Sequence, residues 1–192
     1  FLVLVISSNY LSTFKIFKIE YPILILSSVL GMMVMISSND LIVFYMGLEL
    51  QSLALYVLAT FNRDQLKSSE AGLKYFVLSA LSSGLLLYGC SLIYGFTGST
   101  NFNLIASQLN SNEYAITFGI VFILVGLAFK ISAVPFHMWA PDVYEGSPTS
   151  VTLFFTMVPK IAALTVFIRF LYVPFLNLIE QWQMILIFLS IA

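Results

Sequence analysis

Long apolar stretches alternate with short polar segments along the whole chain. A helix needs about 20 mostly apolar residues to cross the hydrocarbon core of a bilayer. On this measure we expect helices over residues 1–12 (the end of one helix), 21–38, 41–61, 68–96, 114–139 (broken near 132–136), 148–173 and 175–192. The pattern therefore predicts an all-α, polytopic transmembrane helix bundle of about six to seven helices, which forms a single membrane domain over residues 1–192.

The polar segments between these stretches predict short connections. Asn39-Asp40 is a tight hairpin, in which Asp40 is expected to cap the helix that follows it. The stretch from Asn62 to Lys67 is a polar turn, and residues 140–146 form a loop. The longest loop covers residues 97–113, and its apolar positions predict a short interfacial helix at Phe102, Leu104, Ile105 and Leu109.

Composition decides which solvent the chain faces. Hydrophobic residues make up 60% of the sequence and charged residues 9%, with a mean hydropathy of +0.99. Soluble domains carry about 25% charged residues, so much of this surface must face lipid. A net charge of -1 without a basic tract argues against a nucleic-acid surface. Cys90 is the single cysteine, so the chain offers no thiolate set for an iron–sulfur cluster or structural metal site.

The basic residues predict how the helices are oriented. If the predicted crossings alternate, Lys15, Lys18, Arg63 and Lys67 share one side of the membrane, and Arg169 is the main cation on the other. Lysine and arginine concentrate in the loops on the cytoplasmic or matrix side. We therefore place the side of Lys18 in the matrix or cytoplasm, together with the loop at residues 140–146.

Three charged residues lie near the middle of predicted helices: Glu49, Lys130 and Lys160. Each costs roughly 2.5–3.5 kcal/mol to insert at a helix centre, so each must face protein or water and find a partner. A Glu49–lysine pair between neighbouring helices would offset much of this cost. Because burial disfavours the charged form of a lysine, a buried lysine can also take up and release protons. A proton relay is the functional interpretation, and a purely structural buried salt bridge is the alternative.

Two further titratable residues are candidates for the same relay. Lys74 lies about one and a half turns inside its helix, where its stem can equally snorkel to the interface. His137 is the single histidine, of a residue type suited to proton transfer near neutral pH. A bracing role in the loop is as consistent with its position as a relay role.

A proline close to a buried lysine predicts a discontinuous helix. Pro135 follows Lys130 by five residues, and proline removes a backbone hydrogen bond and clashes with the preceding turn. Broken backbone inside a membrane is tolerated where it lines protein or a water-filled cavity, and transporters build ion sites there. Pro159, directly before Lys160, repeats the arrangement on the next helix. Separately, Gly31, Gly84 and Gly89 are expected to allow close helix approach.

Three stretches of sequence resemble one known family. They are GLAFKISAVPFHMWAPDVYEGSPTSVTLFFTMVPK (Gly126 to Lys160), GLELQSLALYVLA (Gly47 to Ala59) and EAGLKYFVLSALSSGLLLYGCSLIYGFTG (Glu70 to Gly98). Together they resemble the antiporter-like subunits of respiratory complex I, over most of residues 22–173. The run LFFTMVPK before Lys160 favours the subunit 2 branch, close to plant and protist mitochondrial versions, over subunits 4 and 5.

The resemblance implies roles for particular residues. Glu49, Lys74, Lys130 and Lys160 match the glutamate and lysines of the family's proton relay, with Lys130 on the discontinuous helix. It also implies a half-channel from the matrix side and a horizontal chain of protonatable residues. No redox cofactor is expected on this chain, and NAD, flavin, iron–sulfur clusters and ubiquinone are expected elsewhere in the complex.

The resemblance further implies a setting and partners. The expected location is the mitochondrial inner membrane, with other complex I membrane-arm subunits and lipids as neighbours. The chain begins at Phe1 inside an apolar stretch and covers about one of the family's two inverted repeats. We therefore expect a split gene product or part of a longer chain, with a second chain supplying the missing half.

Three functions are consistent with the sequence. The first is a proton-translocating core subunit of mitochondrial complex I, which acts within an NADH:ubiquinone reductase of the translocase class. The second is a subunit of a related cation/proton antiporter complex. The third is a structural remnant that braces the membrane arm, with its relay disconnected.

Overall fold

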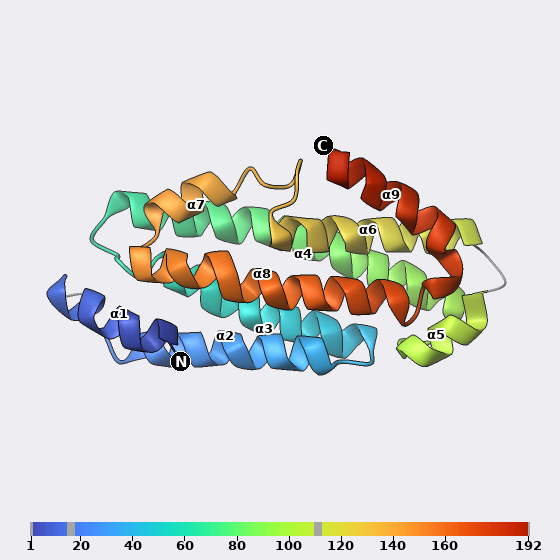
Figure 1. The fold of residues 1–192 in the computed structure, drawn as a ribbon, viewed down its shortest axis with the longest axis horizontal. Helices are drawn as coiled ribbons and strands as arrows, with labels where there is room; N and C mark the ends of the chain where they lie inside the picture. The colour runs from blue at the N-terminus through green and yellow to red at the C-terminus, as the bar shows by residue number, and fades with distance from the viewer. Residues whose placement is uncertain (1, 15–17, 110–112, 192) are drawn as a thin grey trace.

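Five long helices lie side by side along the length of the molecule. The computed structural model describes residues 2–14, 18–109 and 113–191 (Figure 1). Its helices long and apolar enough to cross a membrane include α2 (Glu20–Ser37), α3 (Leu41–Ala59), α4 (Leu66–Thr97), α6 (Glu113–Ile131) and α8 (Thr149–Tyr172). Shorter elements are α1 (Leu2–Thr13), α5 (Phe102–Gln108), α7 (Ala140–Gly146), the 3-10 helix η2 (Leu176–Leu178) and α9 (Ile179–Ile191).

The predicted all-helical membrane bundle is confirmed, with two corrections to its elements. The helix predicted over residues 114–139 with a break near 132–136 is interrupted where expected, after Ile131, but the chain stays non-helical until Ala140. Residues 140–146, predicted as a loop, form the helix α7. The short helix predicted near Phe102 is present as α5, but Phe102 and Ile105 are buried in the bundle rather than lying at a lipid interface.

Local sequence explains where several helices begin and end. Asp40 caps α3 as predicted, since its carboxylate accepts a hydrogen bond from the amide of Ile42 at 2.8 Å. The Thr100 hydroxyl donates to the same carboxylate, which joins the α2–α3 hairpin to the loop after α4. That loop begins at Gly98, whose positive φ of 67° ends α4.

The basic residues that the sequence assigned to opposite sides of the membrane lie, where the structure describes them, at opposite ends of the bundle. Lys18, Arg63 and Lys67 lie beside the start of α2 and the junction of α3 and α4, which share one end in Figure 1. Arg169 lies toward the opposite end, where its guanidinium donates to the carbonyl of Ile36 in the last turn of α2. Lys15 lies outside the described residues.

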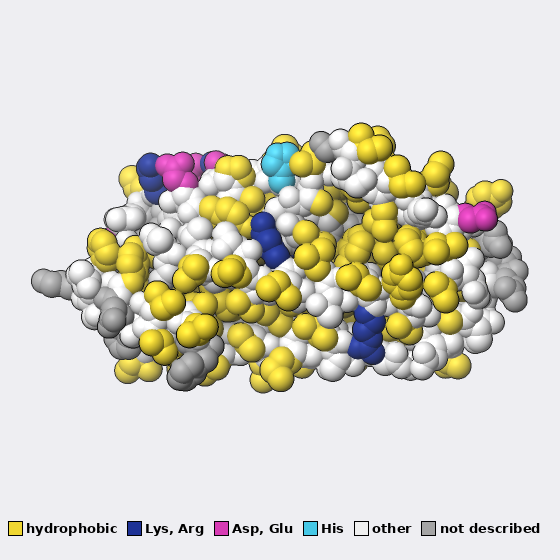
Figure 2. All heavy atoms as spheres, in the orientation of Figure 1, with side chains coloured by type: hydrophobic (Ala, Val, Ile, Leu, Met, Phe, Trp, Pro, Cys, Tyr) yellow, Lys and Arg dark blue, Asp and Glu magenta, His cyan; other side chains and the backbone are white. Residues whose placement is uncertain are grey.

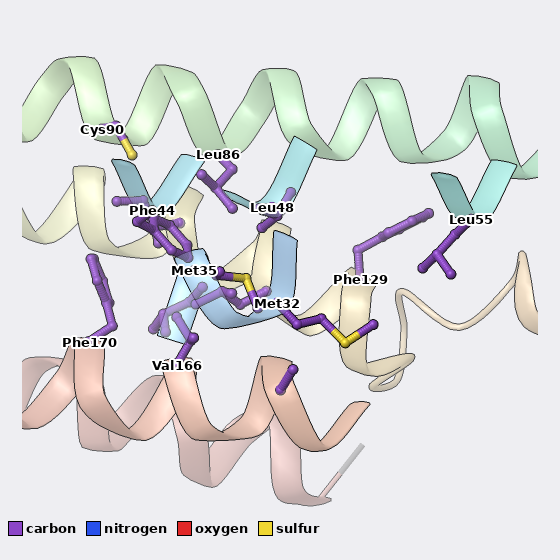
Figure 3. Close-up of a cluster of buried hydrophobic side chains, with 14 of the residues drawn as sticks. Met32, Met35, Phe44, Leu48, Leu55, Leu86, Cys90, Phe129, Val166 and Phe170 are labelled. Carbon is purple, nitrogen blue, oxygen red and sulfur yellow. The ribbon is translucent and has the colours of Figure 1, made fainter. Parts of the chain in front are cut away.

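The core lies where α2, α3, α4, α6 and α8 meet. Figure 3 shows side chains from all five helices gathered there, among them Met35, Phe44, Leu86, Phe129 and Phe170. Many large apolar side chains instead point outward, and Figure 2 shows hydrophobic side chains spread over most of the visible face. A bundle with an apolar interior and an apolar exterior is what a lipid solvent requires.

Pairs of glycines allow two close helix contacts. A Cβ atom at Gly31 would lie 2.8 Å from the carbonyl oxygen of Gly47, between α2 and α3. One at Gly89 would lie 2.7 Å from the carbonyl oxygen of Gly119, between α4 and α6. Gly84 does not make the close approach predicted for it, because nothing lies within 4 Å of its Cβ position.

Candidate functional site

The break after α6 is built by a left-handed turn at Ser132. Its φ is 64°, and the Ser132 and Ala133 amides donate to the carbonyls of Phe129 and Ala128 at 3.1 and 2.9 Å. This pair of bonds is the Schellman motif, which satisfies the last carbonyls of a helix and usually has glycine at the left-handed position. The chain leaves the helical path three residues before Pro135, so the turn at Ser132, rather than the proline alone, ends α6.

Replacing Ser132 by glycine is expected to stabilise the fold. A left-handed conformation costs a side-chain-bearing residue roughly 1–2 kcal/mol, while glycine loses more backbone entropy on folding by roughly 0.5–1 kcal/mol. Within the part of the chain that the structure describes, the buried Ser132 hydroxyl also has no hydrogen-bond partner. We expect Ser132→Gly to stabilise by about 0.5–1 kcal/mol in a thermal melt of the purified assembly. Ser91→Gly, the same change on an exposed helical position, should be destabilising by about 0.5 kcal/mol; a destabilising Ser132→Gly would contradict the argument.

Lys130 lies in the last turn of α6, two residues before Ser132, and is buried, with 7% of its surface exposed. Its Nζ atom donates to the hydroxyl of Ser52 on α3 at 2.7 Å and to that of Ser79 on α4 at 2.6 Å. It also lies 5.9 Å from the centre of the Tyr56 ring, within the range of a cation–π contact. The last turn of α6 therefore carries its cation into a polar pocket formed by two neighbouring helices.

The hydroxyl groups around Lys130 are themselves connected. Tyr56 donates to Ser79 at 2.7 Å, so Ser79 accepts from both the tyrosine and the lysine. Ser52 donates to the carbonyl of Leu48 at 2.7 Å, which fixes its oxygen as the acceptor for Lys130. Lys130, Ser79 and Tyr56 thus form one continuous hydrogen-bonded series in the middle of the bundle.

Glu49 does not form the ion pair with a lysine that the sequence predicted. Among the described residues the ion pairs within 4 Å do not include Glu49, and its buried Oε1 atom has no hydrogen-bond partner. Glu49, Ser52 and Tyr56 follow one another at helical spacing on one face of α3. The hydroxyls of Ser52 and Ser79, rather than the Glu49 carboxylate, therefore accept the hydrogen bonds of Lys130.

Lys160 is half-buried on α8, apart from the Lys130 pocket. Its Nζ atom lies 5.4 Å from the centre of the Tyr144 ring on α7. The Tyr144 hydroxyl is buried without a hydrogen-bond partner in the described part of the chain. Buried polar groups of this kind are usually satisfied by ordered water. The Lys160 ammonium therefore lies against the aromatic ring of a residue on α7.

The structure separates Lys74 and His137 from the Lys130 pocket. The Lys74 ammonium lies between Glu70 and Asp142, 2.7 Å from a carboxylate oxygen of each. Figure 2 shows basic and acidic side chains gathered at this end of the molecule. His137 lies in the non-helical segment after α6 with its side chain exposed.

Sequence reasoning missed Ser52, Ser79 and Tyr56. Serine and tyrosine are common in transmembrane helices, so neither residue type marks a site by itself. The available signal was their helical spacing from Glu49 on α3, which places Ser52 and Tyr56 on the face that carries the glutamate. Ser79 has no such neighbour on α4, and only the three-dimensional contact reveals it.

Comparison with known proteins identifies the family to which the sequence of this chain is similar. A family model described as "NADH:quinone oxidoreductase/Mrp antiporter, TM" matches residues 38–192. NADH-quinone oxidoreductase subunit N of Pelagibacter ubique is 83% identical over 190 residues, which cover 99% of this chain and 40% of that protein. Subunit N of Maricaulis maris is 60% identical, over 94% of this chain and 38% of that protein. The chain thus spans about two fifths of the length of these relatives.

Solved structures agree with the sequence comparison. A chain of "Respiratory complex I from Thermus thermophilus with bound Aureothin" superposes with a TM-score of 0.72 at 39% identity, covering 79% of this chain and 34% of that one. A chain of the Mrp complex from Dietzia superposes with a TM-score of 0.74 at 29% identity, covering 81% and 29%. With its broken helix and buried lysine, the chain belongs to the NADH:quinone oxidoreductase/Mrp antiporter family of transmembrane subunits.

Proposed function

We propose that this chain is part of a proton-translocating membrane subunit of an NADH:quinone oxidoreductase. The observation that carries the proposal is Lys130, a buried ammonium at the end of a broken helix that is held by hydroxyl groups instead of a carboxylate. A lysine without a paired anion in a low-dielectric site can lose its proton at a smaller cost than one held in an ion pair. Such a group suits a step in which a proton is bound and then passed on.

The surrounding residues suggest how the proton moves. Glu49 lies one turn of α3 from Ser52, whose hydroxyl accepts from Lys130, and in this proposal its carboxylate is a neighbouring proton site. Ser79 and Tyr56 continue the hydrogen-bonded series away from Lys130. Lys160 provides the next cationic site, on α8. In this proposal Lys74, with its two carboxylate partners, lies where protons enter from the end of the bundle. His137 braces the exposed segment after α6 and does not carry protons.

The chemistry that drives the pump belongs to other parts of the complex. Subunit N relatives are named as components of NADH-quinone oxidoreductase, and we propose that NAD, flavin, iron–sulfur clusters and a quinone are handled there. In this proposal the chain contributes to a translocase without carrying a redox site of its own. Its partners are further complex I membrane subunits and lipids, and the second chain predicted to complete the fold remains a prediction.

The relatives bear on the membrane in which the subunit works. The relatives and structures named above come from bacteria, which favours a bacterial respiratory membrane over the mitochondrial inner membrane predicted from the sequence. A cation/proton antiporter complex is the second candidate, because the Dietzia Mrp chain superposes as well as the Thermus one. Purification with subunits identified by mass spectrometry separates the two: redox subunits in the assembly support the oxidoreductase.

Loss of Lys130 or Lys160 tests the relay. We expect Lys130→Ala and Lys160→Ala complexes, reconstituted in vesicles, to move fewer protons per electron than the wild type. Removing a charge from the membrane interior relieves an insertion cost, so these variants should still assemble. Lys18→Ala, which removes an exposed lysine outside the helices, should leave the ratio unchanged. Unchanged ratios in both site variants would reject the relay and leave a role in bracing the membrane arm.

A further inference from the structure

The two hydroxyl groups that hold Lys130 differ in what their own hydrogen atoms do. The Ser52 hydroxyl donates to the carbonyl of Leu48, one turn earlier on α3, at 2.7 Å. The Ser79 hydroxyl accepts from Lys130 at 2.6 Å and from Tyr56 at 2.7 Å. Among the hydrogen bonds of the described residues it donates none, although a serine inside a helix often donates to the carbonyl four residues before it. The hydrogen of Ser79 can therefore turn, whereas that of Ser52 is already bound.

The pocket has acceptors for Lys130 in its charged state. An ammonium group carries three hydrogens and no lone pair. Ser52 and Ser79 accept two of these hydrogens, and the third is left for the face of the Tyr56 ring, whose centre lies 5.9 Å from Nζ. A hydroxyl oxygen has two lone pairs. In the charged state both lone pairs of Ser79 are in use, one by Lys130 and one by Tyr56.

Loss of a proton changes what Lys130 needs from its neighbours. A neutral amine keeps two N–H groups and gains a lone pair, which accepts a hydrogen bond. Lys130 and Ser79 are 7% and 0% exposed, so the pocket itself has to satisfy that lone pair. Ser52 has no hydrogen to offer, because its own is bound to Leu48. Ser79 has one, since rotation about its Cβ–Oγ bond turns the hydrogen toward Nζ while the oxygen still accepts from Tyr56.

Packing around Tyr56 keeps the Ser79 oxygen in place during this rotation. The Tyr56 ring meets those of Tyr75 and Phe76 edge to face, with 5.0 and 5.5 Å between the ring centres. Edge-to-face contacts are favourable arrangements of aromatic rings, and two of them hold the phenol in one orientation. The Tyr56 hydroxyl therefore stays directed at Ser79 in both states of the lysine, and one serine hydrogen is the atom that has to move.

A carboxylate in the place of Ser79 would act differently. An ionised carboxylate only accepts hydrogen bonds, so it stabilises the ammonium and offers nothing to the amine. An opposite charge this close to a lysine displaces its proton equilibrium toward the charged form by roughly ten- to thousandfold. The ion pairs within 4 Å in the described part of the chain do not include Lys130. Its hydroxyl partners therefore suit two protonation states, where a carboxylate would suit one.

We propose that Ser79 is a positioning residue that hydrogen-bonds Lys130 in both protonation states, accepting from the ammonium and donating to the amine, whereas Ser52 is an acceptor in both. When Lys130 releases a proton to the next acceptor of the relay, the electron pair of the broken N–H bond stays on Nζ, and the Ser79 hydroxyl turns to meet it. No bond of Ser79 breaks. The inference rests on the proposed function, because the amine state arises when Lys130 passes on its proton, and it specifies which hydroxyl supports each state.

Two side chains of equal size test the dual role of Ser79. Ser79→Asn keeps a donor and an acceptor in the pocket, while Ser79→Asp offers acceptors alone. In reconstituted complexes, we expect Ser79→Asp to lower the number of protons moved per electron as far as Lys130→Ala does, because the neutral fraction of Lys130 falls by about tenfold or more. Ser79→Asn should retain most of the translocation that Lys130→Ala removes. In a thermal melt Ser79→Asp should be no less stable than Ser79→Asn, because its carboxylate neutralises the buried ammonium.

Two single alanine variants perturb the same pocket with a smaller change of volume. Ser52→Ala and Ser79→Ala each remove one acceptor of the ammonium, at nearly equal distances. Ser79→Ala also removes the donor to the amine, so it should lower the proton-to-electron ratio, whereas Ser52→Ala should leave the ratio close to that of the wild type. Adding Tyr56→Phe to Ser79→Ala removes the hydroxyl that has lost its acceptor. This double variant should recover thermal stability but not the ratio, which a purely structural role of Ser79 does not predict.

The outcomes separate the role of Ser79 from the relay itself. Equal ratios in Ser79→Asn and Ser79→Asp would overturn the dual role, and so would equal ratios in Ser52→Ala and Ser79→Ala. The alanine pair decides if the two larger side chains prevent assembly. A lowered ratio in Lys130→Ala together with equal ratios within a matched pair retains the relay and rejects the role of Ser79. An unchanged ratio in Lys130→Ala rejects the relay, and with it the amine state that Ser79 is proposed to support.

Discussion

Replacing both Ser52 and Ser79 by alanine is expected to destabilise this subunit by roughly 3–5 kcal/mol, because it leaves a buried ammonium without hydrogen-bond acceptors. Each serine holds the Lys130 Nζ atom at 2.6–2.7 Å. Hydrogen bonds to a charged group contribute about 1.5–3 kcal/mol each. The change also removes the acceptor of the Tyr56 hydroxyl. The measurement is a thermal melt of the purified complex in which the soluble fraction of this subunit is followed by mass spectrometry.

Two further variants show whether Lys130 is the cause. Ser28→Ala with Ser150→Ala makes the same chemical change at buried hydroxyls that have no hydrogen-bond partner among the described residues, so it should be close to neutral. Adding Lys130→Met to the Ser52 and Ser79 changes should restore most of the lost stability, because the unpaired charge is gone, while proton translocation stays impaired. If adding Lys130→Met restores no stability, the two serines contribute through packing alone, and the pocket between α3 and α4 does not serve to hold the lysine.

Sequence patterns predicted the bundle and its buried charges for a simple physical reason. A membrane imposes a helix length and makes every mid-span charge expensive, so both features stand out in a single sequence. The bounds of α2, α3, α4 and α8 fall within two residues of their predicted positions. Lys130 was identified in the same way, since an isolated lysine in an apolar run has to find a polar partner.

The partner of Lys130 was beyond the reach of the sequence. Opposite charge predicted Glu49, but a lysine has a long flexible stem, and any acceptor within its reach on two neighbouring helices can satisfy it. The structure gives it the hydroxyls of Ser52 and Ser79. Which acceptor lies nearest depends on how α3, α4 and α6 pack against one another, and no periodicity within one helix encodes that.

The course of the chain after the break shows the same limit. The sequence predicted an interruption near residues 132–136, and α6 does end at Ile131, but it did not predict that residues 140–146 would form α7. The polar sequence there is typical of a loop. The segment is helical because Trp139 packs against Tyr75 and Phe129 and because its carboxylates pair with α4. Tertiary contacts of this kind override local preference.

Replacing Gly47 by alanine is expected to destabilise the bundle by about 2 kcal/mol or more, despite the higher helix propensity of alanine. A Cβ atom there would lie 2.6 Å from the backbone nitrogen and 2.9 Å from the Cα atom of Met35. Both are backbone atoms, so no side chain can rotate away and α2 and α3 must move apart. Inserting a methyl group into a packed interface costs roughly 1–3 kcal/mol. Since Glu49 and Ser52 follow within two turns of α3, the shift should also weaken the hold on Lys130.

Gly84→Ala is the matched control for this change. Gly84 also lies in the interior of a transmembrane helix, but nothing is within 4 Å of its Cβ position, so alanine should stabilise by up to about 1 kcal/mol through helix propensity alone. The same subunit-resolved thermal melt should therefore move in opposite directions for the two variants. Equal melting temperatures for the Gly47→Ala and Gly84→Ala variants would mean that α2 and α3 are not in backbone contact at Gly31 and Gly47. A lower Gly47→Ala melting point with weaker proton translocation would link this contact to the position of the Lys130 pocket.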